Sequence, residues 1–141
     1  MRLETKIEME GPLFTGSAAR KFRGAAEDAV KELVQLGEGR LLEQLRPRPS
    51  GVFLSVAAVA SPDPRTGNYR RNIQSKTKNL SGLITDGGVV YGPWLEGISS
   101  RNSSSRFKGY ATFRRVNDWL KERSKPVFRS HVERWVRRMN A

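Results

Sequence analysis

Residues 17–46 read SAARKFRGAAEDAVKELVQLGEGRLLEQLR, and this stretch decides the fold. Its apolar side chains recur three or four residues apart, at Phe22, Ala26, Ala29, Val30, Leu33 and Leu36. That spacing predicts one long amphipathic helix, with Ser17 as its N-cap and Pro47 as its stop. Gly37 and Gly39 interrupt the pattern, so the sequence predicts a bend or a break there.

The segments on either side of this helix predict β-strands. Residues 2–10 alternate polar and apolar side chains, which is typical of a half-buried strand. Residues 52–60 form an apolar, β-branched run, and residues 72–78 alternate again. Residues 80–85 and 89–91 flank Asp86-Gly87-Gly88, which is a hairpin signal. Together these segments predict an antiparallel sheet of about four strands, spanning residues 52–96.

The C-terminal part predicts helices after a polar loop at residues 97–105. Residues 110–123 have a helical apolar face, and Ser124-Lys125-Pro126 restarts the pattern as a second helix. The last apolar face consists of Phe128, Val132, Trp135, Val136 and Met139. The expected fold is therefore α+β in a single domain over residues 1–141: a strand, a long helix, the sheet, then helices over about 110–140.

The composition argues against several classes of protein. There is no cysteine, so thiolate metal sites and cysteine nucleophiles are excluded. No apolar run has the length needed to span a bilayer, and the first residues carry no apolar signal core. His131 is the single histidine and has no metal-ligand or catalytic companion in the sequence. We therefore expect a non-enzymatic protein that is made in the cytoplasm and uses no cofactor or metal.

The charge is strongly positive and unevenly distributed. The formal net charge is +12, and residues 101–141 hold 12 Lys and Arg against three Asp and Glu. The basic C-terminal surface includes Arg129, Arg134, Arg137 and Arg138. Such polarity predicts a polyanion or an acidic protein nearby, although a solvated basic helix face gives the same pattern.

The stretch at residues 89–116 interleaves aromatic and basic side chains. Three interpretations remain open: a protein–protein interface, core aromatics with solvated cations between them, and direct contact with nucleic-acid bases. We favour the interface, because these aromatics lack the placement on central strands that an RNA-recognition motif needs. The candidate interface residues are Tyr91, Trp94, Glu96, Arg101, Arg106 and Phe107. On this hypothesis, Glu96→Arg blocks assembly while the monomer stays folded.

Two segments carry a resemblance to a known family. Residues 91–97, YGPWLEG, come before a Ser/Arg-rich loop and then Arg106-Phe107 and a terminal helix. Residues 66–73, TGNYRRNI, lead into a strand. This order resembles the neck proteins of long-tailed bacteriophages, which include tail-completion, tail-terminator and minor tail proteins. The resemblance covers residues 18–139.

The resemblance implies a structural role in the virion. Family members form a ring, commonly of six subunits, that joins the head to the tail or terminates the tail tube. DNA passes through the lumen of the ring. The expected partners are other copies of the chain, neighbouring neck proteins or the tail tube protein, and the passing DNA. The loop at residues 61–71 is then expected to face the lumen or the next ring with Arg65, Arg70 and Arg71.

Two other functions compete with the ring. The first is a small basic DNA- or RNA-binding module that uses the C-terminal helices, although the Lys125-Pro126 junction fits a helix-turn-helix poorly. Steep weakening of duplex binding by salt would identify such a module. The second is a small basic ribonuclease, which would have to use His131 and a scattered glutamate.

Overall fold

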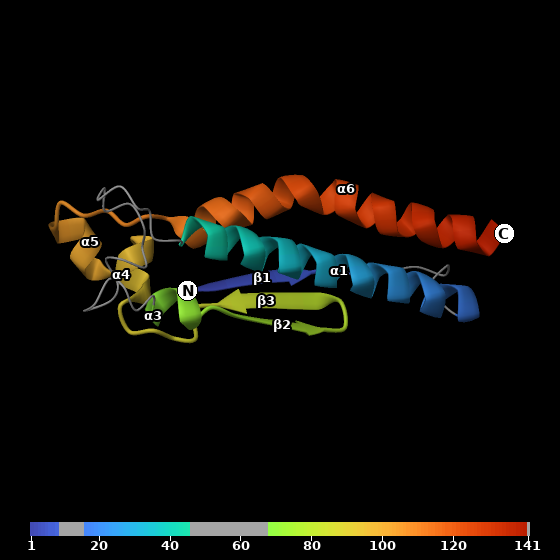
Figure 1. Cartoon of the computed structure of the whole chain (residues 1–141), viewed down its shortest axis with the longest axis horizontal. Coiled ribbons are helices and arrows are strands. Elements are labelled where there is room, and N and C mark those ends of the chain that lie inside the picture. The colour runs from blue at the N-terminus through green and yellow to red at the C-terminus, as the bar shows by residue number, and fades with distance from the viewer. Residues whose placement is uncertain (9–15, 46–67, 141) are drawn as a thin grey trace.

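The computed structural model describes residues 1–8, 16–45 and 68–140. Their elements are β1 (Arg2–Lys6), α1 (Ser17–Gln44), α3 (Asn68–Arg71), β2 (Gln74–Lys78), β3 (Ser81–Thr85), α4 (Gly92–Glu96), α5 (Ser100–Ser104) and α6 (Thr112–Asn140). Figure 1 shows an elongated molecule in which α1 lies between the sheet and α6. The α+β class with a long N-terminal helix is confirmed.

The predicted apolar stripe of α1 forms the centre of the core. Ala26, Ala29, Val30 and Leu33 are all buried. The helix runs unbroken through both glycines, so the predicted break is wrong. A Cβ atom on Gly37 would lie 2.7 Å from Leu120 Cδ1 and 2.8 Å from Ile84 Cδ1. This glycine therefore lets α6 and the sheet approach the helix closely. Gly16, rather than Ser17, occupies the N-cap.

The sheet has three antiparallel strands in the described part of the chain, in the order β1-β3-β2. Its inner face packs on α1 through Leu3 and Ile84, and Gly82 leaves room for Val34. The predicted strand at residues 52–60 lies outside the described residues. The strand predicted at 89–91 is wrong, because these residues form a turn that leads into α4. The hairpin therefore turns at Asn79, which has a φ of 53°, and not at Asp86-Gly87-Gly88.

The C-terminal region is one helix, α6, rather than two. Pro126 lies inside it, so the predicted restart at that proline is wrong. Figure 1 shows α6 following α1 along nearly its whole length, and this packing stabilises the helix through a proline that cannot donate a backbone hydrogen bond. Phe113, Val116 and Leu120 are buried as predicted.

Beyond the sheet, α1 and α6 continue together as a two-helix projection (Figure 1), which we call the arm and define as residues 17–28 and 128–140. Phe22 packs edge-on against Phe128 and Trp135, with ring centroids 6.1 and 5.4 Å apart. At the base of the arm, His131 Nε2 lies 2.6 Å from Glu32 Oε2. The arm thus places the basic end of the chain far from α4 and α5.

Candidate functional site

The segment predicted as an interface folds into two short helices at the end of the molecule opposite the arm tip (Figure 1). The sequence at residues 91–97 is not a strand end, as predicted, but helix α4. Its N-cap is Tyr91, and Pro93 supplies a preset helical φ in the first turn. Gly97 ends the helix with a φ of 99°. The structure thus brings most of the candidate residues together, although by a different local conformation.

Aromatic rings connect α4 to the segment that leads into α6. The rings of Trp94 and Phe107 have centroids 4.6 Å apart, and those of Phe107 and Tyr110 are 4.9 Å apart. Tyr91 packs against Tyr69 of α3 at 5.9 Å. These rings are half-buried or buried, so the core interpretation accounts for part of each aromatic surface. Their remaining surface faces outward at the end of the molecule.

A hollow of about 330 Å³ opens beside these rings. We call it the aromatic hollow; its lining is Val90, Tyr91, Pro93, Trp94, Ser99 and Arg101. Three of the six predicted interface residues, Tyr91, Trp94 and Arg101, therefore line one concave surface. Val90 is 95% exposed and Ile98 is 65% exposed, so two aliphatic side chains are in contact with solvent at this end of the molecule. Sequence reasoning missed both residues, because isolated aliphatic side chains give no local signal.

Glu96 has a different role from the predicted one. Its side chain is buried and accepts hydrogen bonds from the backbone N–H groups of Phe113 (3.0 Å) and Arg114 (2.9 Å). These donors belong to the first turn of α6, where the helix itself provides no carbonyl acceptor for them. The carboxylate thus caps α6 and complements its positive N-terminal dipole. We therefore assign Glu96 to the fold, and we expect Glu96→Arg to unfold the monomer.

The Ser/Arg-rich segment is an ordered element rather than the predicted polar loop. Ser99 and Asn102 form a capping box at the start of α5. The buried Asn102 amide also donates to the carbonyls of Trp94 (2.9 Å) and Phe107 (3.2 Å). The Ser-x-x-Asn spacing is the sequence signal that could have revealed this helix. This network fixes the backbone on which Arg101 and Arg106 stand exposed.

A buried carboxylate organises the other side of the hollow. Asp86 is fully buried and lies 2.8 Å from the amino group of Met1. Its oxygens also accept hydrogen bonds from the Tyr69 hydroxyl (3.4 Å) and the Gly88 N–H (3.1 Å). A Cβ on Gly92 would lie 2.0 Å from the same carboxylate, so α4 can begin here only with glycine. Asp86 thereby joins β3, α3 and α4.

Tyr69 makes this junction sensitive to alkaline pH. Burial, followed by the nearby carboxylates of Asp86 and Glu96, raises the pKa of the Tyr69 phenol. A folded-state pKa above the unfolded value contributes stability that is present below about pH 10 and lost as the pH rises further. We expect chemical denaturation to show Tyr69→Phe losing less stability above that pH than the original chain. Parallel pH profiles for the two proteins would contradict this.

The other predicted basic residues have mixed environments. Arg65 lies outside the described residues. Arg70 Nε donates to the Leu42 carbonyl at 3.1 Å, so it caps the C-terminal turn of α1 instead of projecting from a loop. Arg71 is exposed. The four C-terminal arginines at 129, 134, 137 and 138 are all exposed along α6, which gives them the surface position that was predicted.

Comparisons with known proteins leave the family open. No protein-family model, curated protein or solved structure significantly matches the chain. In the described residues, no helix is long and apolar enough to cross a membrane.

Proposed function

We propose that the chain is a structural virion protein of the head–tail junction or tail top of a long-tailed bacteriophage. It acts as one subunit of a ring that joins the head to the tail or terminates the tail tube, with DNA passing through the lumen. The sequence resemblance at residues 66–73 and 91–107 supports this role. The shape and surface of the molecule support it independently.

The observation that carries the proposal is a pair of apolar surfaces at opposite ends of the molecule. Val90 lines the aromatic hollow and is almost fully exposed, and Ile98 is exposed just after α4 at the same end of the molecule. Val136 and Met139, 40% and 47% exposed, belong to the last two turns of α6. That end of α6 forms the tip of the arm, at the other end of the molecule (Figure 1). Two different surfaces at opposite ends favour head-to-tail association, and such association produces a ring when its rotation closes.

The aromatic hollow provides a suitable centre for the contact between subunits. Trp, Tyr and Arg dominate the binding energy of many interfaces, and all three types border this hollow. Arg106 stands on the same ordered segment as Arg101 and remains a candidate rim residue. Glu96 and Asn102 hold the hollow in shape from inside the monomer.

The assembly test is a charge placed on the apolar surface. We expect Val90→Glu to remain folded, because the side chain is 95% exposed, but to lower the mass of the assembled protein toward that of a monomer. Light scattering measures the mass and circular dichroism checks the fold. Gln35→Glu, an equal charge change at an exposed position on α1, is the matched control. Assemblies of unchanged mass in Val90→Glu would contradict the proposed interface.

The exposed arginines of α6 favour a second candidate, a small DNA- or RNA-binding module. The two functions predict opposite effects of salt. Screening weakens binding to nucleic acid, because counterion release supplies much of its free energy. The same screening promotes association of subunits that each carry a net charge of +12.

A further inference from the structure

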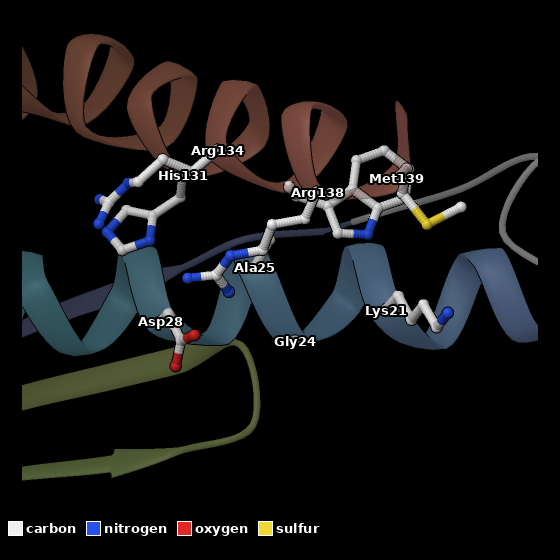
Figure 2. A pocket seen from close by; sticks show the side chains of 9 residues that line it. Lys21, Gly24, Ala25, Asp28, His131, Arg134, Arg138 and Met139 are labelled. Carbon is white, nitrogen blue, oxygen red and sulfur yellow. The ribbon is translucent and has the colours of Figure 1, made fainter. Parts of the chain in front are cut away.

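A groove of about 500 Å³ runs between the two helices of the arm. Lys21, Gly24 and Ala25 line it from α1, and Trp135, Arg138 and Met139 line it from α6. Figure 2 shows Arg138 extending from α6 toward α1 beside Ala25, with Met139 further along the same gap. Because Gly24 and Ala25 have little or no side chain, the two helices leave space between them.

The charges at this groove are mostly positive, and two of its cations are unpaired. Arg134, a third cation of the lining, lies 3.8 Å from Glu32. In the described part of the chain, neither Lys21 nor Arg138 has a carboxylate partner. Asp28 is the single acidic residue of the lining, and it pairs with Lys31 at 3.4 Å. Figure 2 shows the Asp28 side chain pointing away from α6. The groove therefore offers cations that nothing in the described chain neutralises.

Apart from His131 and Arg134, which both lie beside Glu32, the rest of the lining is largely apolar. Met139 is 47% exposed, and Gly24 and Ala25 present only backbone and a methyl group. The indole N–H of Trp135 is buried without a hydrogen-bond acceptor among the described residues. Exposed apolar atoms beside unpaired cations are typical of a surface that another molecule covers.

We propose that this groove binds an acidic amphipathic segment of a partner protein, with an apolar side chain between the helices and carboxylates on Lys21 and Arg138. Charge complementarity selects the acidic residues, and the apolar lining selects a protein segment over nucleic acid, whose backbone has no apolar group to bury there. The inference goes beyond ring formation and does not require it.

The test uses a fluorescein-labelled synthetic helical peptide with leucines on one face flanked by glutamates. The first comparison peptide replaces every glutamate by glutamine, and a short duplex DNA is the third probe. Fluorescence anisotropy measures each affinity. We expect the acidic peptide to bind at least about tenfold more tightly than its glutamine counterpart.

Two variants with the same charge change locate the binding. We expect Arg138→Glu to weaken binding of the acidic peptide by about tenfold or more. Arg137 is an exposed neighbour that does not line the groove, so we expect Arg137→Glu to weaken binding by only about twofold. Val90→Glu leaves every residue of the groove in place, so it should still bind the peptide, which separates this inference from the ring.

Three outcomes would overturn the inference. The first is a failure of the acidic peptide to bind. The second is an equal loss in Arg138→Glu and Arg137→Glu, which would indicate diffuse charge attraction. The third is tighter binding of duplex DNA than of the peptide with the same dependence on Arg138, which would make the groove a phosphate-binding surface.

Discussion

Gly109→Ala is expected to destabilise the protein by about 4 kcal/mol, which is a large share of the roughly 5–15 kcal/mol that holds a typical domain together. The cause is a backbone crossing between the end of α4 and the segment that leads into α6. An alanine Cβ at this position would lie 2.3 Å from both Cα and N of Gly97. These are backbone atoms, so no side chain can move aside.

Two physical terms make up this effect. Gly109 has a φ of 90°, which costs an L-residue about 1–2 kcal/mol, and forced overpacking costs about 1–3 kcal/mol more. The neighbouring 2.7 Å hydrogen bond from Tyr110 N to the Leu95 carbonyl would have to lengthen. Thermal denaturation should show a melting temperature lower by about 12 °C.

Gly39→Ala is the matched control for this prediction. Its Cβ would meet no atom within 4 Å, and it lies inside α1. Because alanine favours the helix, we expect this variant to gain about 0.5–1 kcal/mol. If both variants changed the stability equally, the close approach of Gly97 and Gly109 would not exist.

Glu96→Ala is expected to cost about 3 kcal/mol, the second largest effect. It removes the cap of α6 and leaves the buried N–H of Phe113 and the partly buried N–H of Arg114 without acceptors. Glu96→Gln keeps the shape but loses the charge that faces the helix dipole, so we expect a smaller loss of about 2 kcal/mol. Guanidinium denaturation measures both values.

The control for Glu96 is Glu122→Ala, which removes an exposed carboxylate from α6 itself. That change should stay within about 0.5 kcal/mol of the original stability. Circular dichroism should also show a small loss of total helix content in Glu96→Ala, because the first turn of α6 frays without its cap. Full stability of the Glu96→Ala protein would mean that α6 needs no cap from α4.

The long helix α1 and the strand β1 were predictable because the same spacing of apolar residues repeats along each of them. Ala26, Ala29 and Leu33 face one side of a helix by spacing alone, and the alternation in Arg2–Lys6 identifies a strand without any partner. Both patterns arise from burial on one face, which is the main source of stability for these elements. The extensive packing of α1 against α6 stabilises these two helices further.

The errors fall where local rules compete with tertiary contacts. Asp86-Gly87-Gly88 has good turn chemistry, and residues 87 and 88 do form a turn. Burial of Asp86 against Met1 and Tyr69 directs the chain after this turn into α4 instead of a second hairpin strand. Pro126 favours a helix start, but packing on α1 carries α6 through it. Both outcomes are decided by contacts with residues that are distant in the sequence.

The residue types in the sequence indicated where the candidate site lies, but they did not indicate how its side chains are arranged. Interleaved aromatic and basic residues drew attention to the segment that forms the aromatic hollow. The role of Glu96 depends on donors 17 and 18 residues away, so no sequence spacing indicates it. The arm groove likewise joins residues of α1 and α6 that lie more than a hundred positions apart.

The most direct test of the ring is the mass of the purified chain by light scattering, as salt and protein concentration are raised, with and without duplex DNA. Without DNA, we expect the mass to rise from the 15.9 kDa monomer toward that of a closed ring as salt screens the positive charge. A 15.9 kDa species under every condition, with DNA binding that weakens steeply in salt, would contradict the ring and indicate a nucleic-acid-binding module.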